Sequence, residues 1–397
     1  MPKPRIVVVS PFIDKRHGTE RSVAECLQRL SGAYDIHVYS NRLEDLDLQA
    51  IRWHRVPAIP GPHLIAYLWW FVANGLWRWR DSKFLGIVPE VVFSPGINCL
   101  DADVIQVHVV FAQLREHMKR QLTFRSNPWK AWHQILHRRI YYSLIAFLER
   151  RIYPRRDLHL IAVSRKTAND LTQYYCRSGN IQVAHHGIDL SRFRPEVRVA
   201  LRPAARGMLE LGPVDFTLLL IGNDWKSKGL ACVLKAVASL QDPAFKILVV
   251  GTDNPAPFQQ SIREGDLSRQ IRFLPPRPDV EFYYAVADAY VSPTLEDSFG
   301  LPPAEAMASG LPVITSGLAG VSEIMTSGED SFVLEDPADF AALARVLLRL
   351  KTDFVLRERI ASAAVQTASK LTWDDAAEHL GAAWEAARAE KAANSHR

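Results

Sequence analysis

Short apolar runs alternate with longer amphipathic stretches along most of the chain. The first half contains the runs RIVVVS, DIHVYS, DVIQVH and LHLIAVS, and a helical pattern over Glu20 to Leu30 follows the first of them. Short runs rich in β-branched residues, separated by stretches of helical period, are typical of strand-helix-strand units around a parallel sheet. The pattern therefore predicts an α/β fold.

The alternation starts again after Asp189 to Pro213, a segment that holds three prolines and two glycines. The second series contains DFTLLLIG, FKILVVG, QIRFLP, AYVSP and LPVITS, with a helix expected over residues 229–240. A chain of 397 residues has room for two cores of about 180 to 200 residues each. We therefore expect two doubly wound, Rossmann-like parallel-sheet domains over residues 1–200 and 201–375.

The last part of the chain, from Asp339 to Ala392, is rich in alanine and has a helical pattern. It contains Trp373 and Trp384, two large side chains that can anchor a helix on another surface. We expect a C-terminal helix over residues 376–397 that packs back on the N-terminal domain and ends in a frayed tail.

Composition excludes several classes of protein. The net charge of +5 is small for this length and acidic residues are spread throughout, so nucleic acid binding is not implied. Cys26, Cys99, Cys176 and Cys232 lie far apart, without a CxxC pair or a histidine cluster at the spacing of metal ligands. We expect no metal site, and reduced core cysteines in a cytoplasmic protein.

No segment has the length and hydrophobicity of a targeting or spanning element. The N-terminal apolar run is too short for a signal sequence and no cleavage site follows it, so we expect it to form the first strand. Residues Leu64 to Trp77 approach membrane hydrophobicity, but they are fewer than the roughly 20 that a bilayer requires. We therefore expect a chain that does not cross a membrane.

The strongest functional signal is the segment Ala289 to Ser316, AYVSPTLEDSFGLPPAEAMASGLPVITS. It predicts a strand, a loop with a glycine, a short helix over residues 303–309 and a second strand. Pro302 and Pro303 suit a first helical turn, and Gly310 suits the position just past a helix end. Ligands of α/β sheets bind at such carboxyl ends of strands.

The start of this helix is suited to an anion. The first N–H groups of a helix have no partner within it, and they carry a partial positive charge. We expect Ser298, Phe299, Gly300 and Leu301 to face the phosphate, or another negative part, of a bound sugar nucleotide.

Asp297 and Glu305 stand eight positions apart on either side of this turn, so both carboxylates can address one ligand. A paired ribose diol is a natural target for Glu305. The alternative is structural: Glu305 would complement the helix dipole, worth about 0.3 to 1 kcal/mol, and Asp297 would cap the turn.

The segment resembles the acidic EX7E motif of the retaining family 4 glycosyltransferases (glycosyl transferases group 1), and its FGLPPxEAMAxGxPV string matches closely. The resemblance implies the GT-B fold, two Rossmann-like domains that face a central cleft with the active site. It also implies that Glu305 holds the donor ribose and that the first acidic residue contacts the transferred sugar or its developing charge. That residue is Asp297 here instead of Glu, and its neighbour Glu296 could substitute for it by a shift of register.

The stretch LLLIGNDWKSKGLACVL resembles the family's phosphate loop, in which a basic residue precedes Lys-Gly by five positions. Lys228 and Gly229 match that pair, and the resemblance implies that Lys228 neutralises the leaving diphosphate. Gly222 and Asn223 open the loop and are expected to contact the donor. Asn223 stands in the place of the usual basic residue, so Lys226 would have to supply that contact.

The first half resembles the family more loosely. Gly18 and Thr19 resemble the GGxE donor loop before a helix that starts near Glu20, and their N–H groups can receive phosphate oxygens. His108 ends an apolar strand, where the family commonly keeps a histidine near the reacting sugar. We expect His108 to bind a donor hydroxyl or to orient the acceptor; the alternative is a satisfied core histidine.

LIAVSRKT and AHHGIDLSRFRP resemble the last strand and the connector of the family's first domain. The resemblance implies that Ser164, Arg165, His186 and Gly187 line the cleft. Arg165 would be a second phosphate contact and would offset the missing basic residue of the phosphate loop. Asp189 is expected to cap the connector.

The expected reaction moves a sugar from a nucleoside diphosphate sugar to an acceptor hydroxyl, and retention of configuration is implied by the resemblance alone. Asp297, Glu305, Lys228 and His108 are the candidate catalytic residues. Cationic and amide groups would balance the diphosphate charge, so we expect no metal and no other cofactor to be required. Bacterial surface polysaccharide or glycolipid synthesis, in the cytoplasm or at the inner face of the membrane, is the setting that the family suggests.

Other functions stay open. A GT-B epimerase or a phosphorylase would keep the fold and change the chemistry. A non-catalytic sugar-nucleotide-binding or assembly protein is an alternative because Asp297 and Asn223 depart from the family pattern. A nicotinamide enzyme is disfavoured, since neither half carries GxGxxG after its first strand.

The acceptor side is less determined. Between Arg115 and Arg165 the chain has twelve Lys or Arg against three Asp or Glu. Together with the aromatic stretch from Tyr67 to Arg80, this predicts docking on an anionic lipid surface or on a phosphorylated lipid-linked acceptor. The alternative is a buried aromatic helix and a solvated basic face.

Overall fold

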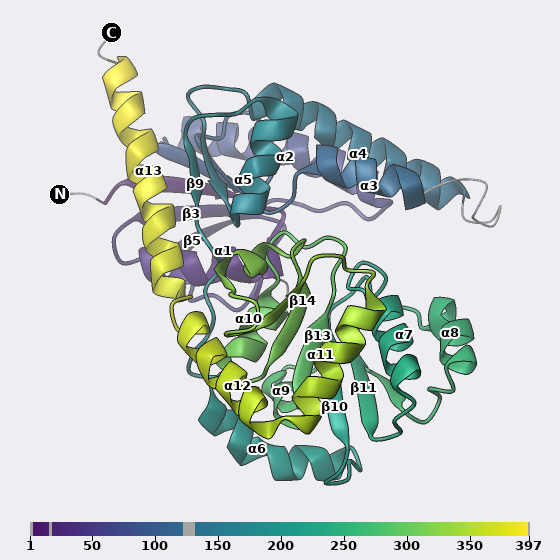
Figure 1. The fold of residues 1–397 in the computed structure, drawn as a ribbon. Coiled ribbons are helices and arrows are strands. Elements are labelled where there is room, and N and C mark those ends of the chain that lie inside the picture. The colour runs from purple at the N-terminus through teal and green to yellow at the C-terminus, as the bar shows by residue number, and fades with distance from the viewer. Residues whose placement is uncertain (1–2, 16–17, 122–131, 396–397) are drawn as a thin grey trace. The chain divides into compact units, whose positions relative to one another are not determined.

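The computed structural model describes residues 3–15, 18–121 and 132–395, and the chain divides into two compact units (Figure 1). Unit 1 comprises residues 1–187 and 373–397, and unit 2 comprises residues 188–372.

The first unit ends before the expected boundary at residue 200, because the connector already belongs to unit 2. Ile188 pairs with Thr372, and the N–H of Ile188 donates to the carbonyl oxygen of Leu371 at 2.9 Å. Asp189 accepts hydrogen bonds from the N–H and the hydroxyl of Ser191, which is the expected cap of the connector.

Unit 1 contains a sheet of seven parallel strands in the order β5-β3-β1-β6-β7-β8-β9. The strands are β1 (Arg5–Val9), β3 (Asp35–Ser40), β5 (Ile51–Arg55), β6 (Val91–Pro95), β7 (Val104–Val107), β8 (His159–Ala162) and β9 (Ile181–Val183). Val7 of β1 pairs with His37 on one side and with Val92 on the other. The apolar run of β1 is buried throughout from Ile6 to Val9, as a parallel strand covered on both faces requires.

A separate parallel pair joins β2 (Phe12–Ile13) to β4 (Arg42–Leu43). The helices of unit 1 are α1 (Gly18–Leu30), α2 (His63–Leu85), α3 (Phe111–Gln121), α4 (Trp132–Ile152), α5 (Arg165–Tyr175) and α13 (Trp373–Ser395).

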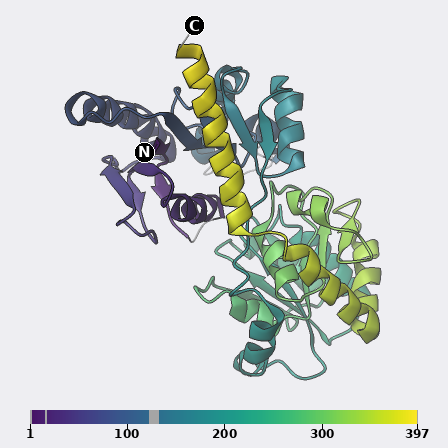
Figure 2. The same ribbon diagram turned by 90° about the vertical axis from the view of Figure 1, so that its left-hand side faces the viewer.

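The C-terminal helix α13 packs on unit 1, although it follows unit 2 in the sequence. Figures 1 and 2 show it beside α1. Trp384 is fully buried, and its ring meets the edge of Tyr34 with 5.1 Å between centroids. Gly381 allows the close approach, because a Cβ there would lie 3.2 Å from a methyl group of Leu30. The tryptophan thus supplies the anchor of this helix.

Unit 2 contains six parallel strands in the order β12-β11-β10-β13-β14-β15. They are β10 (Phe216–Ile221), β11 (Phe245–Val250), β12 (Ile271–Leu274), β13 (Ala289–Ser292), β14 (Val313–Ser316) and β15 (Phe332–Leu334). Its helices are α6 (Pro195–Met208), α7 (Leu230–Leu240), α8 (Gln259–Glu264), α9 (Glu281–Val286), α10 (Leu301–Ala308), α11 (Phe340–Thr352) and α12 (Phe354–Ala368), with 3-10 turns η2 (Ala256–Phe258) and η3 (Gly320–Ile324). The expected pair of doubly wound parallel sheets is confirmed.

Each sheet has a point where the order of its strands reverses. In unit 1 the chain moves outward from β1 through β3 to β5 and then returns to the other side of β1 with β6. In unit 2 it moves from β10 through β11 to β12 and returns beside β10 with β13. The helices on either side of such a point diverge, so a crevice forms at the carboxyl ends of the two central strands. These two crevices are where ligand sites are expected.

Two remaining expectations can be compared with the structure. Cys26, Cys99 and Cys232 are buried thiols, but Cys176 is exposed. The expectation of a core position for Cys176 was therefore wrong: this residue ends α5 in the left-handed conformation, at φ 54°, where the chain turns outward. In the part of the chain that the structure describes, no helix combines the length and the apolar character needed to span a bilayer.

Candidate functional site

The loop after β13 leads into α10, which begins two residues earlier than expected, at Leu301. Gly300 precedes it with φ 99°, a conformation that lets the loop turn sharply into the helix. Pro302 and Pro303 occupy the first turn, and Gly310 follows the helix with φ 72°, as expected. Because both prolines lack an N–H, Gly300 and Leu301 supply the N–H groups at this helix start. The helix start therefore has fewer N–H groups for an anion than that of an ordinary helix.

Lys228 reaches this loop from the loop that follows the neighbouring strand, β10. Gly222, at the end of β10, has φ 130°, and a Cβ there would lie 3.3 Å from Cε of Lys228. The lysine side chain therefore runs across the glycine. Gly229 has φ 82°, and a Cβ there would overlap the carbonyl group of Pro293. The Lys-Gly pair thus brings the phosphate loop against the end of β13.

The ammonium of Lys228 forms an ion pair and a hydrogen bond with the carboxylate of Asp297. Both side chains are about one-fifth exposed. Asp297 lies over the start of α10, since its Oδ2 atom would be 3.3 Å from a Cβ on Gly300. One cation, one carboxylate and the N–H groups at the start of α10 therefore gather at the carboxyl ends of β10 and β13, which is where the strand order of unit 2 reverses.

Backbone hydrogen bonds hold the loop of Asp297 in place. Its carbonyl oxygen accepts from Gly320 N–H at 3.0 Å, and its own N–H donates to the carbonyl oxygen of Leu318 at 3.3 Å. The carbonyl oxygen of Phe299 accepts from Val321 N–H at 2.7 Å, and the Phe299 ring is buried. The carboxylate position is therefore set by the segment after β14, which the sequence did not single out.

Glu305 is the fifth of the eight residues of α10 and is 5% exposed. Its Oε2 atom accepts a hydrogen bond of 2.8 Å from the hydroxyl of Tyr284, a residue of α9. The same hydroxyl lies 3.2 Å from the carbonyl oxygen of Pro302. Tyr284 thus orients the carboxylate relative to the helix start. Sequence reasoning missed this tyrosine, because one of two adjacent tyrosines in a short apolar helix carries no distinguishing pattern.

Asn223 has a structural partner that accounts for its side chain. Its Oδ1 atom accepts from the N–H of Thr252 at 2.9 Å and from the Thr252 hydroxyl at 3.0 Å. The amide therefore ties the loop after β10 to the loop after β11. Lys226, the residue that would replace the missing basic contact, is exposed.

In unit 1, His108 and His186 stack with 5.2 Å between ring centroids. His186 Nδ1 lies 2.9 Å from the hydroxyl of Ser22. Among the described residues, Nε2 of His108 has no hydrogen-bond partner, although His108 is only 8% exposed. Burial, together with the nearby His186, lowers the pKa of His108 well below its ordinary value, so this imidazole is neutral near pH 7.

The other predicted residues of unit 1 lie at helix starts and strand ends. Gly18 and Thr19 belong to the first turn of α1 instead of the loop before it, so their N–H groups are those of a helix start. Ser164 caps α5 by accepting from Thr167 N–H at 3.1 Å, and Arg165 is the first residue of that helix and is exposed. Gly187 ends unit 1.

The predicted residues therefore form two groups. Unit 2 brings together Gly222, Asn223, Lys228, Asp297, Ser298, Phe299, Gly300, Leu301 and Glu305 around the ends of β10 and β13. Unit 1 carries Gly18, Thr19, His108, Arg165 and His186 at the carboxyl ends of its strands and the helix starts that follow.

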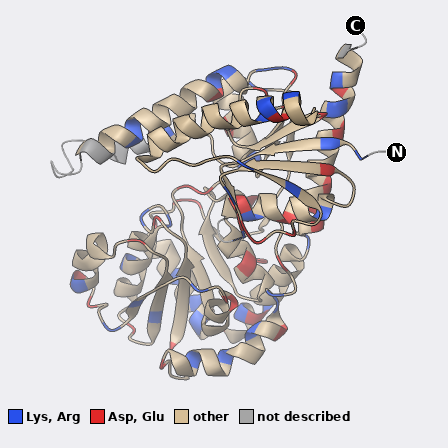
Figure 3. Cartoon of the chain, turned by 180° about the vertical axis from the view of Figure 1, so that it is seen from behind, with Lys and Arg blue, Asp and Glu red and all other residues tan. Residues whose placement is uncertain are grey.

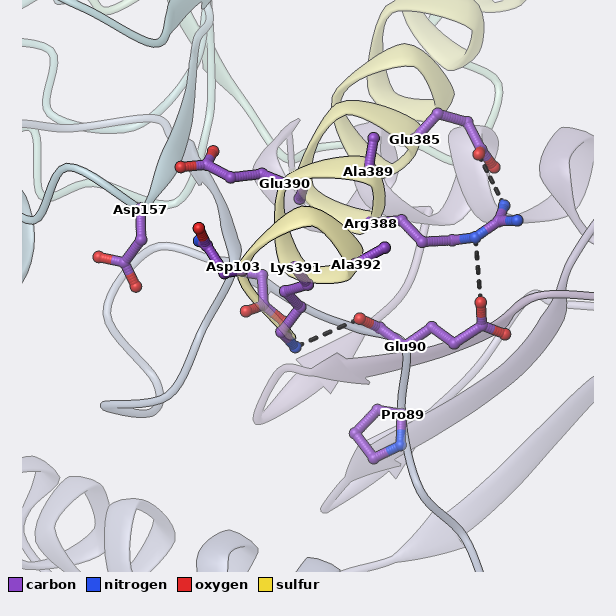
Figure 4. A pocket seen from close by; sticks show the side chains of 12 residues that line it. Pro89, Glu90, Asp103, Asp157, Glu385, Arg388, Ala389, Glu390, Lys391 and Ala392 are labelled. Carbon is purple, nitrogen blue, oxygen red and sulfur yellow. Dashed lines mark hydrogen bonds and ion pairs between the residues drawn. The ribbon is translucent and has the colours of Figure 1, made fainter. Parts of the chain in front are cut away.

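A cavity of about 830 Å³ lies elsewhere in unit 1, beside α13 (Figure 4). Its walls include Glu90, just before β6, and Asp103, just before β7. Arg388 forms an ion pair with Glu90 at 3.0 Å, and Lys391 with Asp103 at 2.7 Å. These two ion pairs attach the C-terminal helix to unit 1. Glu90 and Asp103 lie at the amino ends of their strands, so the cavity is not at the edge where α/β sheets bind ligands.

The site in unit 2 is suited to a ligand that carries both a negative charge and hydroxyl groups. A lysine and helix N–H groups can bind phosphate oxygens, and a buried carboxylate can accept from a diol. Within the described ranges, no cluster of three or more His, Cys, Asp or Glu is arranged to hold a metal ion.

Each half of the chain matches a family model of glycosyltransferases. Residues 16–192 match the family model described as Glycosyltransferase Family 4, and residues 215–353 match the model described as Glycosyl transferases group 1. The fold resembles that of WaaG, a glycosyltransferase involved in lipopolysaccharide biosynthesis, with a TM-score of 0.75 and 20% identity over 95% of this chain and 98% of that chain. It also resembles HepE of Anabaena, solved in complex with UDP-glucose, with a TM-score of 0.71 and 16% identity over 96% and 99%.

The two parallel-sheet units therefore have the GT-B glycosyltransferase fold. The chain belongs to the family 4 and group 1 glycosyltransferases. A D-inositol 3-phosphate glycosyltransferase of Thermomonospora curvata is 32% identical over 56% of this chain and 55% of that protein, and one of Streptomyces bingchenggensis is 32% identical over 55% and 50%. The chain thus spans about half the length of the curated relatives it matches.

Proposed function

We propose that this protein transfers a sugar from a nucleoside diphosphate sugar to an acceptor hydroxyl, with retention of the anomeric configuration. The proposal depends most on the group formed by Lys228, Asp297 and the start of α10 at the reversal point of unit 2. Membership of the family supports the transfer, and the UDP-glucose complex of HepE supports the donor class.

In the proposed step the bond between the anomeric carbon and the diphosphate oxygen breaks. A bond forms from the anomeric carbon to the acceptor oxygen, and the acceptor proton leaves with the diphosphate. Charge therefore accumulates on the leaving phosphate. A cation and preorganised N–H groups at that position stabilise the transition state more than the ground state, which is the usual origin of such catalysis.

The residues have separate roles in this step. A bound diphosphate would compete with Asp297 for the ammonium of Lys228, which releases the carboxylate toward the transferred sugar. Glu305, held by Tyr284, would accept hydrogen bonds from the ribose diol. The Gly300 and Leu301 N–H groups would bind phosphate oxygens. No step in this scheme requires a metal ion.

A panel of nucleoside diphosphate sugars tests the proposal. The full chain is incubated with each donor, with and without candidate glycolipid, sugar and apolar alcohol or phenol acceptors, and the released nucleoside diphosphate is measured by chromatography. One donor should be consumed faster with an acceptor, the product should keep the anomeric configuration by NMR, and added EDTA should leave the rate unchanged. Turnover of donor to an isomeric donor without acceptor would indicate an epimerase, and binding without any turnover would indicate a non-catalytic protein.

We place this reaction in surface polysaccharide or glycolipid synthesis, on the cytoplasmic side of a membrane. The support is an exposed apolar stripe on α2, formed by Ile65, Leu68, Val72, Leu76 and Trp79. Their spacing of three and four residues puts them on one side of the helix. A row of exposed apolar side chains is typical of a surface that contacts a membrane or another protein.

Helix α4, which contacts α2, also has exposed apolar and basic side chains. Tyr67 of α2 and Tyr141 of α4 are in contact, with 5.6 Å between ring centroids. Leu136, Ile140 and Phe147 of α4 are exposed, as are Arg138, Arg150 and Arg151. Figure 3 shows Lys and Arg in blue on the long helices of unit 1. Residues 122–131 of the predicted basic segment lie outside the described residues. The combination supports docking on an anionic lipid surface, since each basic residue there contributes about 1 kcal/mol.

A further inference from the structure

A second cavity of unit 1, of about 480 Å³, lies where the strand order reverses. Ser10 follows β1, Gly96 follows β6 and His108 follows β7, and all three line it. Its volume is in the range of sites for small organic ligands. The cavity is therefore placed and sized as a ligand site, independently of the donor group of unit 2.

Aromatic rings form much of its wall. Tyr67 and Trp70 come from α2, and Phe111 and Tyr141 from α3 and α4. The polar tips of the first two are used within the wall: the Tyr67 hydroxyl donates to the carbonyl oxygen of Ile97 at 2.7 Å, and Trp70 Nε1 donates to Asn98 Oδ1 at 3.3 Å. With their polar ends engaged, these side chains can offer their apolar surfaces to a ligand.

The charges at the cavity argue against an anionic ligand. Two carboxylates line it, those of Glu20 and Glu149, and none of the described lining residues is Lys or Arg. Glu149 is fully buried and accepts from the N–H groups of Phe111 at 3.0 Å and Ala112 at 3.2 Å, and from the Tyr175 hydroxyl. Burial raises the pKa of Glu149 to about 7. An anion placed here would lose its hydration without gaining a described cationic partner.

One polar group of the wall still requires a partner. A buried nitrogen without a hydrogen bond costs about 1 to 3 kcal/mol, so the unpartnered Nε2 of His108 points to a ligand that completes it. A neutral imidazole nitrogen can pair with one hydroxyl group. The cavity thus combines an apolar wall with a single position for a hydroxyl.

We propose that this cavity binds an uncharged acceptor with an aromatic or other apolar body, and that its hydroxyl pairs with Nε2 of His108. The inference rests on the proposed glycosyl transfer and names the class of acceptor: an apolar alcohol or phenol. It differs from the inositol phosphate in the names of the curated relatives, because a phosphate requires cationic partners and none of the described residues of this wall is Lys or Arg.

Binding of an uncharged fluorophore tests the cavity without any knowledge of the donor. N-phenyl-1-naphthylamine is titrated into the full chain, and its brightening in an apolar site is followed. We expect saturable binding that 2-naphthol displaces at least tenfold better than 2-naphthyl phosphate, its anionic counterpart. Absence of saturable binding, or equal displacement by the two competitors, would overturn the proposal.

Variants of the chain test whether the fluorophore binds in this cavity. Ala66→Trp places a ring into the cavity and should weaken binding of the fluorophore at least tenfold, whereas Val199→Trp adds the same ring at an exposed position of α6 and should not. His108→Ala should weaken 2-naphthol at least fivefold and leave naphthalene, which lacks the hydroxyl, within twofold. Circular dichroism checks that each variant is folded. If a variant does not fold, the comparison of 2-naphthol with 2-naphthyl phosphate on the unaltered chain still tests the proposal.

The two proposals can fail separately. Glu305→Gln lies in unit 2 and should abolish donor turnover while the fluorophore still binds. Turnover of a donor by a chain that fails to bind the fluorophore would leave the glycosyl transfer standing and remove the apolar acceptor. Binding of the fluorophore without turnover of any donor would remove the glycosyl transfer, and with it the acceptor role, and would leave the cavity as a binding site for an uncharged apolar ligand.

Discussion

Lys228 and Asp297 are joined by an ion pair across 69 positions of sequence, between the loop after β10 and the loop after β13. These two strands are adjacent in the sheet and flank its reversal point. The pair therefore links the phosphate loop to the acidic motif within one unit, and it sits at the start of α10. Both partners are mostly buried, so each strongly constrains the position of the other.

Replacement of the lysine tests its role. Lys228→Ala removes the cation that would balance the leaving diphosphate, and we expect donor turnover to fall roughly 10² to 10³-fold, the usual loss of one preorganised electrostatic group. Lys235→Ala, an exposed lysine of α7, is the control and should keep its rate. The measurement is nucleoside diphosphate release at saturating donor. A loss of less than threefold for Lys228→Ala would contradict the assignment.

Tyr284 is expected to act through Glu305 and not on the sugar itself. Tyr284→Phe removes the 2.8 Å hydrogen bond to Oε2 and keeps the ring, so we expect the KM of the donor to rise at least about tenfold, since a bond to a charged group is worth about 1.5 to 3 kcal/mol. The kcat should change less than twofold. Tyr283→Phe, whose hydroxyl donates to the carbonyl oxygen of Pro275, is the matched control. Unchanged KM in the first variant would show that Tyr284 is structural only.

Gly229 is required by its backbone and by its neighbour. Gly229→Ala meets both a left-handed conformation and an overlap with the Pro293 carbonyl, so we expect unit 2 to lose at least about 2 kcal/mol of unfolding free energy. Gly317→Ala has open space around its Cβ and should change stability by less than about 0.5 kcal/mol. Chemical denaturation followed by fluorescence gives both values. Equal midpoints would refute the steric argument.

Trp384 is expected to hold the C-terminal helix on unit 1. Trp384→Ala leaves a cavity against Tyr34 and should destabilise that unit by about 3 to 5 kcal/mol. Trp79→Ala removes the same side chain from an exposed position and should cost under about 0.5 kcal/mol. Thermal unfolding compares the two. A small effect in the first variant would mean that the ion pairs of Arg388 and Lys391 carry the attachment.

The apolar stripe of α2 predicts binding to lipid. Co-flotation with vesicles of phosphatidylcholine and phosphatidylglycerol should be strong at low salt and weaker at high salt, because the arginines of α4 contribute electrostatically. Leu68→Asp with Leu76→Asp should lower the bound fraction at least tenfold. Val199→Asp with Met208→Asp places the same charges on the exposed side of α6 and is the control. Equal flotation of both double variants would exclude the stripe as the contact.

Much of the fold could be predicted because its causes are local in sequence. β-branched runs such as that of β1 and the interrupting helical periods determine the strand and helix order, and proline and glycine determine where α10 can start and end. The resemblance in the segment from Ala289 to Ser316 then identified Glu305 and Asp297 as candidates. The unit boundary, the position of Cys176 and the exact ends of several helices differed, because helix ends depend on capping contacts that can come from distant segments.

The amino-acid sequence by itself determined the class of fold, the family and the residues that carry the motifs, because those depend on period, turn chemistry and spacing. Tertiary structure alone decided which of them meet: the pairing of Lys228 with Asp297, the hydrogen bond from Tyr284 to Glu305, and the aromatic cavity that His108 faces. These contacts join segments from different strands and helices. Their partners are chosen by the strand order of each sheet, and no local pattern encodes that order.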